Sequence, residues 1–297
     1  IDSRQRKQVL QDNDTNIGYD GPIIVLVGKL SASASEIVAA ALQDYGRALL
    51  VGSLSTHGKG SVQTVMPLNN WVRLPNSGKL KLTVSKFYRV AGGTTQKQGV
   101  TPDIILPTPY DYMEIGEATL PNSLEADHTE KLAYRRVNRV LGHVDTLTEL
   151  SNGRISNDQD FSYILEDIDT LKERLKDKSV SLSEAARLAE KDDDKANREK
   201  RKTERKARGD AEETVFDLTI KMIKTDTKLG EEVEDEEKPI RLEEEPEDGE
   251  EIEDEEDQPK LDPHMRETLH ILHDYIKLLK SKEQIAAKEI GGEIKTQ

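Results

Sequence analysis

Short apolar runs, separated by small and polar residues, characterise the first part of the chain. The first run, residues 22–27 (PIIVLV), is continuously apolar, and a second, residues 48–51 (ALLV), follows a helix-like stretch at 36–45. Continuous apolar strands are typical of sheets buried on both faces, and two strands joined by a helix are typical of a parallel α/β core. The pattern therefore predicts a strand, a helix that ends at Gly46 and a second buried strand.

Polar and apolar residues alternate over two further segments, residues 62–68 and 79–90. Alternation with a period of two is typical of strands that have one exposed face. Turn residues at 75–78 separate the two segments, and a last apolar run follows at 104–107. We therefore expect a β-rich part of the chain that ends near residue 108.

Beyond residue 108 the spacing of apolar residues becomes helical. Residues 128–150 and 158–176 are predicted helices, the second with apolar side chains on one stripe. A capping-box signal at Ser181 begins a third helix. That helix runs into residues 191–208, a block of mixed charge with almost no apolar face, which indicates a solvated helix.

Residues 231–257 consist mainly of Glu and Asp and have almost nothing to bury. Such a segment cannot offset the entropy lost on ordering, so we expect a disordered linker. No loop in this segment has the glycine and the fixed ligand spacing of a dedicated calcium site. After Pro263 a final amphipathic helix is predicted, with one apolar stripe that contains Leu269, Leu272, Ile276 and Leu279.

These patterns together predict an α/β core followed by a mainly α-helical C-terminal domain. The expected bounds are 1–108 for the core and 109–227 for the helical domain. An acidic linker is expected at 228–262. The terminal helix, 263–297, is expected to dock on the helical domain.

Composition excludes several classes of function. The net charge of −15 disfavours a nucleic-acid partner, because phosphate binding requires concentrated positive charge. The chain has no cysteine, so it has neither disulfides nor thiolate metal sites. No apolar run approaches the roughly 20 residues that a membrane-spanning helix needs. Because the sequence begins at Ile1 without a methionine or signal peptide, we interpret it as an internal fragment.

Three serines spaced by alanines, residues 31–36 (SASASE), stand between the first predicted strand and helix. A serine at such a turn can present its hydroxyl to a cleft, while backbone N–H groups of the first helical turn face a developing oxyanion. The hydroxyl needs a base, and a lysine can serve where burial favours the neutral amine. Lys59, flanked by two glycines, fits this role, although a serine at a helix start also acts as a simple cap.

Two other side chains are alternative bases for the middle serine, Ser33. Lys29 follows the first strand directly. His57 lies two residues before Lys59 and, with Asp44, could form a Ser-His-Asp arrangement. These alternatives stay open at the level of sequence.

Two further motifs fail on their spacing. Residues 58–61 (GKGS) are not a phosphate loop, because Gly60 separates the lysine from the serine and the upstream glycine is missing. His270 and His273 share a helical face, but no third metal ligand is in view. The sequence therefore predicts no metal site.

Three segments resemble the carboxyl-terminal (tail-specific) processing proteases of family S41, and most closely their Prc-like branch. They are SASASEIVAAALQDYGRALLVG, HGKGSVQ and KFYRVAGGTTQKQGVTPDIILPT. The likeness covers about residues 15–108 and continues more weakly to the C-terminus. Members of this family are serine peptidases with a Ser–Lys dyad. The resemblance implies a core with the ClpP/crotonase-like fold.

Carried over by position, the resemblance makes Ser33 the nucleophile, Lys59 the general base and Gln63 the residue that orients the lysine. Asp44 matches an aspartate with a supporting role in some members. Our candidate for the oxyanion hole is the backbone N–H of Ala34. One departure is the segment SLSTH before Gly58, which is one residue longer than the family's usual spacing and could displace Lys59.

The function implied by the resemblance is a periplasmic serine endopeptidase that recognises proteins by apolar C-terminal tails. Such an enzyme needs no metal or organic cofactor, and some members work with an adaptor lipoprotein. The chain lacks the family's PDZ module and the glycine-rich segment of the oxyanion hole, so the isolated fragment is not expected to carry full activity. The alternatives are an inactive protein-binding module and an acidic scaffold protein.

Overall fold

The computed structural model describes residues 13–14, 16–70, 77–177, 179–209 and 261–293. These residues fall into two compact units. One unit contains the residues up to 176 together with those from 263 onward, and the other lies within residues 177–262. Most of the predicted acidic linker lies outside the described residues, as does residue 15 and everything before residue 13.

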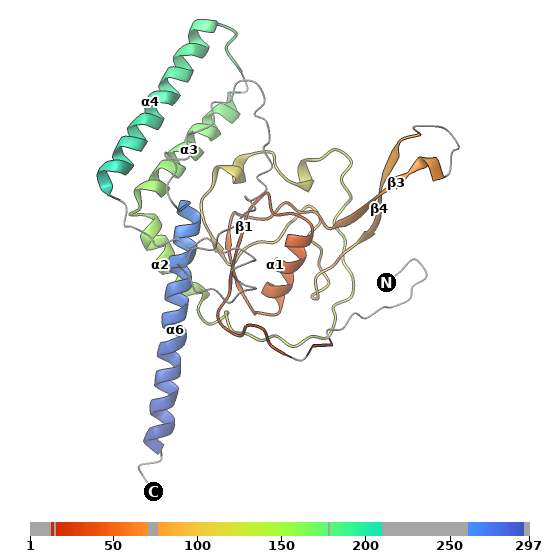
Figure 1. The fold of residues 1–297 in the computed structure, drawn as a ribbon, viewed down its shortest axis with the longest axis vertical. Coiled ribbons are helices and arrows are strands. Elements are labelled where there is room, and N and C mark those ends of the chain that lie inside the picture. Colours follow the sequence, from red (N-terminus) through yellow and green to blue (C-terminus); the bar gives the residue numbers. More distant parts are fainter. Residues whose placement is uncertain (1–12, 15, 71–76, 178, 210–260, 294–297) are drawn as a thin grey trace, which may run out of the picture. The chain divides into compact units, whose positions relative to one another are not determined.

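A three-stranded parallel sheet forms the centre of the first unit (Figure 1). Its strands are β1 (Ile24–Val27), β2 (Leu49–Gly52) and β5 (Ile104–Ile105), in the order β1-β2-β5. Helix α1 (Ala34–Asp44) connects β1 to β2. This arrangement confirms the predicted α/β core.

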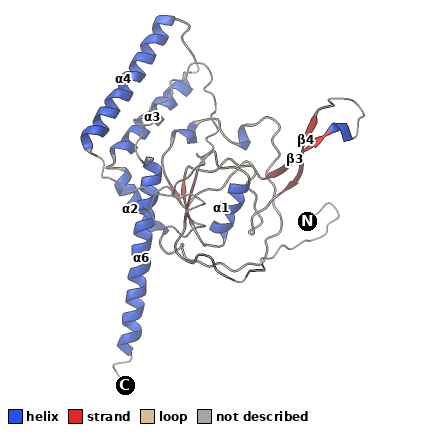
Figure 2. Ribbon diagram, viewed as in Figure 1, coloured by secondary structure: helices blue, strands red, loops and turns tan. Residues whose placement is uncertain are grey.

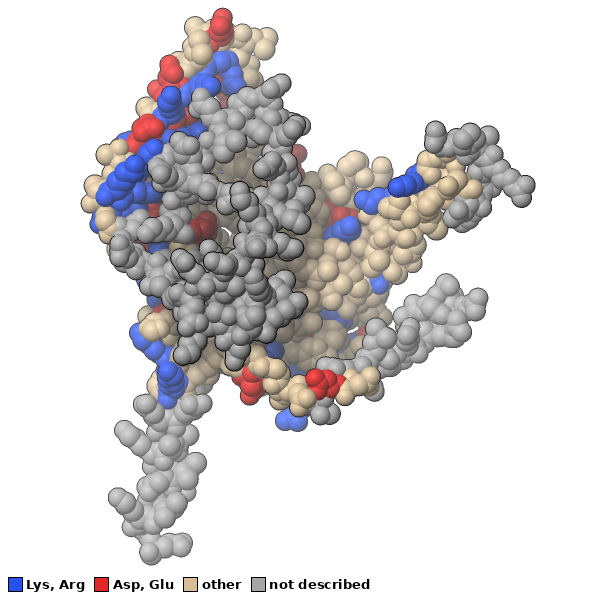
Figure 3. Space-filling view, in the orientation of Figure 1, with Lys and Arg blue, Asp and Glu red and all other residues tan. Residues whose placement is uncertain are grey.

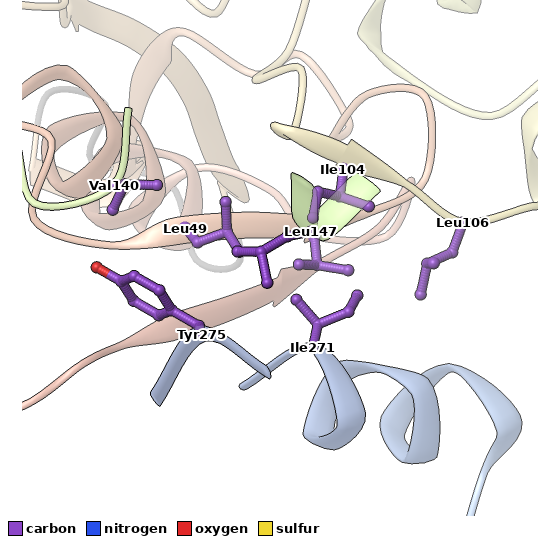
Figure 4. Packing of buried hydrophobic residues seen from close by; sticks show 8 residues of the cluster. Leu49, Ile104, Leu106, Val140, Leu147, Ile271 and Tyr275 are labelled. Carbon is purple, nitrogen blue, oxygen red and sulfur yellow. The ribbon is translucent and has the colours of Figure 1, made fainter. Parts of the chain in front are cut away.

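Side chains of β2 alternate between two buried clusters, one on each face of the sheet. Leu50 packs with α1 through a cluster that also contains Val27, Ala39, Ala40 and Val100. The opposite face packs against α2 (Val144–Ile155) and α6 (Pro263–Glu293), as Figure 4 shows. That cluster consists of Leu49, Val51, Ile104, Leu106, Val140, Leu147, Ile271 and Tyr275.

The prediction of burial on both faces holds for β2 and is wrong for β1. Every residue of β2 is buried, whereas only Val27 of β1 is buried and Leu26 is 37% exposed. The reason is position, because β1 is an edge strand that pairs only with β2 among the described residues.

Strands β3 (Ser61–Pro67) and β4 (Lys79–Lys86) form an antiparallel hairpin outside the central sheet (Figure 2). A short 3-10 helix, Leu68–Asn70, follows β3. Two expectations are wrong here: the second strand ends at Lys86 instead of residue 90, and both faces of β4 are exposed instead of one. The hairpin has no second layer to cover either face within the described residues.

The predicted helix at 128–150 begins only at residue 144, with α2. Residues 129–139 instead give their backbone N–H groups to distant carbonyls: Thr129 to Gly92, Leu132 to Val90, Val137 to Tyr45 and Arg139 to Gly46. These tertiary hydrogen bonds replace the helical ones and override the helical pattern. The stretch before it contains two 3-10 helices, Pro109–Tyr112 (η2) and Glu117–Thr119 (η3).

Two further helices follow α2, in agreement with the predicted pattern, but the N-cap of the second is Ser183 and not the predicted Ser181. They are α3 (Gln159–Lys176) in the first unit and α4 (Glu184–Arg208) in the second. No residue of α4 is buried, which confirms a solvated helix, and Figure 3 shows its charged side chains on the surface.

The terminal helix exists, and its predicted stripe is only partly right. Ile271 and Tyr275 are the α6 residues in the buried hydrophobic cluster, and Leu279 of the predicted stripe packs against that cluster, whereas Leu269 is 47% exposed. The helix packs on the sheet as well as on α2, so its buried face is set by the sheet. None of the helices in the described part of the chain is long and apolar enough to cross a membrane.

Candidate active site

Ser33 stands at the turn between β1 and α1 and has a strained backbone. Its φ of 60° and ψ of −113° resemble the first central position of a type II′ turn, where glycine is usual. Such a conformation costs a serine about 1–3 kcal/mol. Nearby serines stabilise the turn, because Gly28 N–H donates to Ser31 Oγ at 3.1 Å and Ser35 Oγ donates to the carbonyl of Ala32 at 2.8 Å.

Ala34, the candidate oxyanion donor, is the first residue of α1 and is exposed. The first helical hydrogen bond runs from Ile37 N–H to the carbonyl of Ser33, at 3.1 Å. A residue at the start of a helix has no acceptor for its N–H within that helix. The Ala34 N–H therefore has no acceptor within α1.

Glu36 is fully buried and connects the Ser33 turn to the Lys59 loop. Its Oε2 accepts the N–H groups of Ser33 at 2.8 Å and of Lys59 at 2.9 Å. Its Oε1 accepts the N–H of Gly58 at 2.8 Å and the hydroxyl of Thr56 at 2.5 Å. A carboxylate offers about four acceptor positions, and hydrogen bonds to it are stronger than neutral ones. One buried carboxylate therefore holds the Ser33 turn and the Lys59 loop side by side.

The glycines that flank Lys59 lie against the segment 94–97. Gly58 has a φ of 93°, and its carbonyl accepts the N–H of Lys97 at 2.7 Å. A Cβ on Gly60 would lie 2.7 Å from the backbone nitrogen of Gln96, so no larger residue fits. Gly60 N–H in turn donates to Oε1 of the buried Gln96 at 2.9 Å.

The longer segment before Gly58 is accommodated without breaking these contacts. Leu54 is 46% exposed at the apex, and its N–H donates to Asp111 Oδ1 at 3.0 Å. Ser55 Oγ accepts a hydrogen bond from Lys29 Nζ at 2.8 Å. His57 N–H donates to the carbonyl of Ser31 at 2.9 Å. The backbone N–H of Lys59 shares Glu36 Oε2 with that of Ser33.

Glu36 brings the backbones of Ser33 and Lys59 together, but the side chains of this predicted dyad are not hydrogen-bonded to each other among the described residues. Among the described residues, no hydrogen bond joins Ser33 Oγ to Lys59 Nζ or Gln63 to Lys59. Lys59 is partly buried, and Gln63 is exposed on β3 opposite Thr83. Catalytic hydrogen bonds are often longer without substrate and tighten in the complex.

The two alternative bases have other surroundings. Lys29 Nζ donates to Ser55 Oγ. The Nδ1 atom of His57 is buried and has no hydrogen-bond partner within the described part of the chain. Neither side chain has a hydrogen bond to Ser33 there, and Asp44 is not bonded to His57.

Asp44 lies at the opposite end of α1 from Ser33, which is roughly 15 Å along the helix axis. Its carboxylate accepts hydrogen bonds from Arg89 Nε at 3.0 Å and from Arg89 Nη2 at 2.6 Å. Arg89 Nη2 also donates to Gln43 Oε1 at 2.9 Å. Any supporting role of Asp44 therefore acts through the fold, by holding the segment after β4 to α1.

The sequence analysis missed Glu36, Thr56 and Gln96 as residues of the site. One available signal was the Ser-x-x-Glu spacing from Ser33 to Glu36, which is that of a capping box. Thr56 and Gln96 carry no such local signal, because their partners are at least 20 positions away. No group of three His, Asp or Glu side chains in the described residues could hold a metal ion.

Comparisons with known proteins match both parts of the chain. Residues 1–106 match peptidase family S41, and residues 110–277 match the C-terminal domain of tail specific protease. The tail-specific protease of Haemophilus influenzae is 40% identical over 209 residues, which cover 69% of this chain and 30% of that protein. The carboxy-terminal-processing protease of Bartonella bacilliformis is 47% identical over 130 residues, which cover 40% of this chain and 28% of that protein.

A photosystem II D1 C-terminal processing protease of known structure is 40% identical, with a TM-score of 0.25, and the match covers 29% of this chain and 20% of that one. The chain spans less than a third of the length of these relatives. The two family matches confirm the resemblance found in the sequence, and the second alone covers more than half of the chain. The chain therefore belongs to the carboxyl-terminal processing, or tail-specific, proteases of peptidase family S41.

Proposed function

We propose that this chain carries the catalytic dyad of a serine endopeptidase, with Ser33 as nucleophile and Lys59 as general base. The observation that carries this proposal is that both residues donate their backbone N–H groups to Oε2 of the buried Glu36. The strained turn at Ser33 and the start of α1 behind it support a role in attack on a carbonyl group.

The reaction begins when neutral Lys59 takes the proton of the Ser33 hydroxyl. Ser33 Oγ attacks the carbonyl carbon of the peptide, and the N–H of Ala34 stabilises the negative oxygen of the tetrahedral intermediate. Protonated Lys59 then gives its proton to the leaving amine as the C–N bond breaks. Water, activated by Lys59, attacks the acyl-enzyme and releases Ser33 and the second product. No metal or cofactor takes part in these steps.

Gln63 has a proposed positioning role. It lies four residues after Lys59, on β3, and its exposed side chain has space to turn toward the lysine. A hydrogen bond donated by the Lys59 amine to the Gln63 amide oxygen would orient this amine toward Ser33. Asp44, in contrast, supports the site through its ion pair with Arg89.

The proposed substrates are proteins or peptides with apolar C-terminal tails. The relatives are named for tail-specific or carboxy-terminal processing. Apolar side chains close to Ser33 in sequence are exposed, Leu30 by 68%, Ile37 by 44% and Val38 by 57%, which supports apolar recognition. We further propose a periplasmic location and a possible adaptor lipoprotein as partner, both from the family resemblance alone.

The test compares cleavage of two unfolded proteins, one with an apolar C-terminus and one ending in charged residues, by the full-length protein. We expect preferential cleavage of the first, and at least about 10³-fold slower cleavage by the Ser33→Ala and Lys59→Ala variants. The same assay with this chain alone measures what the rest of the protein adds. Full activity of Lys59→Ala would refute the dyad and favour Lys29 or His57.

A protein-binding module without activity is the second candidate. The observation that favours it is that no hydrogen bond joins the Ser33 and Lys59 side chains among the described residues. This candidate predicts that the full-length protein binds the apolar tail without cutting it. It also predicts equal binding by wild type and Ser33→Ala.

A further inference from the structure

The loop that leads to Lys59 is held at its start by a residue from the following domain. Asp111 lies in η2, within the region that matches the tail-specific C-terminal domain. Its Oδ1 accepts the N–H of Leu54 at 3.0 Å, across 57 positions of sequence. Leu54 belongs to the segment SLSTH, which connects the end of β2 to Gly58.

The segment 107–112 that contains Asp111 is itself fixed by two helices of the C-terminal region. His264 of α6 is hydrogen-bonded through Nε2 to the carbonyl of Pro107 at 2.9 Å. Lys172 of α3 places its Nζ 4.4 Å from the centre of the Tyr112 ring, which is a favourable cation–π geometry. Asp111 therefore lies in a segment that contacts both α6 and α3.

A second contact from the same domain holds the other end of the loop. Glu117 N–H donates to the carbonyl of His57 at 2.9 Å, two residues before Lys59. Gly116 allows this approach, because its φ is 132° and a Cβ there would lie 3.0 Å from the His57 carbonyl oxygen. Gln96 also joins Glu117 to the loop, with Nε2 on Glu117 Oε1 at 3.1 Å and Oε1 on Gly60 N–H.

We propose that Asp111 is a positioning residue for Lys59, so that the helices of the C-terminal region set the geometry of the dyad. This inference rests on the proposed function of Ser33 and Lys59. A loop without tertiary contacts has conformations in which Lys59 is displaced, and a hydrogen bond to the loop backbone disfavours them. The Leu54–Asp111 bond thus holds the start of the loop that ends at the Glu36 contact.

The test uses the full-length protein with Asp111→Ala and Asp111→Asn. Asn keeps an oxygen that accepts the Leu54 N–H, whereas Ala removes it. We expect Asp111→Ala to lower kcat about tenfold with KM changed by less than about twofold, because it affects the dyad and not substrate binding. Asp111→Asn is expected to keep most of kcat. The control is Asp20→Ala, which removes an exposed carboxylate that is paired with Arg139 and lies before β1 in the sequence.

A second measurement does not depend on activity. In Asp111→Ala, amide hydrogen exchange should become faster in residues 53–60 and stay unchanged in α6. Unchanged exchange in this loop, or an Asp111→Asn variant as slow as Asp111→Ala, would overturn the proposal. If the wild type itself does not cut, the proposed function fails, and faster loop exchange in Asp111→Ala would still support the positional contact.

Discussion

Ser33 and Lys59 share one oxygen atom of Glu36. Their N–H groups lie 2.8 and 2.9 Å from its Oε2. This contact joins two backbones that are 26 positions apart, and it leaves both side chains free for chemistry. A buried carboxylate at the helix start thus has a structural role, because it fixes the backbone of the two residues of the proposed dyad.

The first prediction concerns the loss of that carboxylate. Glu36→Gln replaces one acceptor oxygen by an NH₂ donor. The two groups that donated hydrogen bonds to that oxygen then have no acceptor. We expect stability to fall by about 3 kcal/mol, because each unsatisfied buried donor costs about 1–3 kcal/mol. Urea unfolding measures the loss, and cleavage assays at low temperature should show a further decrease in kcat.

Glu36→Asp is the matched control for this prediction. It keeps the charge but shortens the side chain, so it should lose fewer of the four contacts. A Glu36→Gln variant with unchanged stability would show that these hydrogen bonds contribute nothing net.

The second prediction concerns backbone strain at Ser33. Ser33→Gly should stabilise the protein by about 1 kcal/mol, because the strain of about 1–3 kcal/mol is relieved while glycine adds about 0.5–1 kcal/mol of entropy cost. Activity should be lost with the hydroxyl. Thermal unfolding of Ser33→Gly and Ser33→Ala separates the two effects, and equal melting temperatures would argue against strain.

The third prediction assigns Asp44 a structural role. Asp44→Ala leaves the Arg89 guanidinium partly buried without its carboxylate, and we expect a loss of stability of about 2 kcal/mol. The double variant Asp44→Ala/Arg89→Leu should recover part of this loss. At low temperature both variants should keep kcat within about threefold of wild type. A loss of more than about 10²-fold with intact folding would place Asp44 in the chemistry.

The fourth prediction concerns the docking of α6 on α2. Arg154 contacts Glu267 at 2.8 Å and Asp274 at 2.6 Å, and the Glu267 side chain is only 4% exposed. Arg154→Ala should cost about 3 kcal/mol, because it leaves Glu267 buried and unpaired. The control is Arg187→Ala on α4, where the pair with Glu190 is more than half exposed. That change should cost less than about 0.5 kcal/mol.

The fifth prediction concerns pH. Burial raises the pKa of the Asp111 carboxyl, and the opposing effects of Leu54 N–H, Lys29 and His264 do not cancel it. The folded protein therefore binds this proton more tightly than the unfolded chain does. The stability that Asp111 contributes is fully present below the usual aspartate range and is lost as pH rises through its raised pKa.

Unfolding at several pH values should show this loss in wild type and not in Asp111→Asn. NMR titration of the Asp111 carboxyl carbon gives the pKa directly. A midpoint at or below the usual aspartate value would contradict the prediction. The hydrogen bond from Lys86 lowers the pKa of Asp127. The same NMR titration should therefore give Asp127 a midpoint below the usual aspartate value.

Much of the core could be predicted from local patterns. The runs at β1 and β2, and the small residues around Ser33, indicate a strand, a turn and a helix, and the structure contains these elements. Periodicity and turn chemistry act over a few residues, so they can be read directly from the chain. The positions of Ser33 and Lys59 in matching segments led to the family that the comparisons confirm.

Other features required the tertiary structure. Residues 128–143 had a helical pattern, yet their backbone bonds to Gly92, Tyr45 and other distant carbonyls keep most of them extended. The buried face of α6 depends on which surface covers it, so Ile271 and Tyr275 were found only in the packed fold. The domain bounds at 108, 227 and 262 stay predictions.

Sequence alone thus determined the local elements, the family and the candidate dyad. Only the tertiary structure decided that Glu36 joins Ser33 to Lys59, that Asp44 pairs with Arg89 at the far end of α1, and that Asp111 reaches Leu54. The reason is physical. A hydrogen bond between residues 20 or more positions apart depends on how whole elements pack, and no local spacing records that distance.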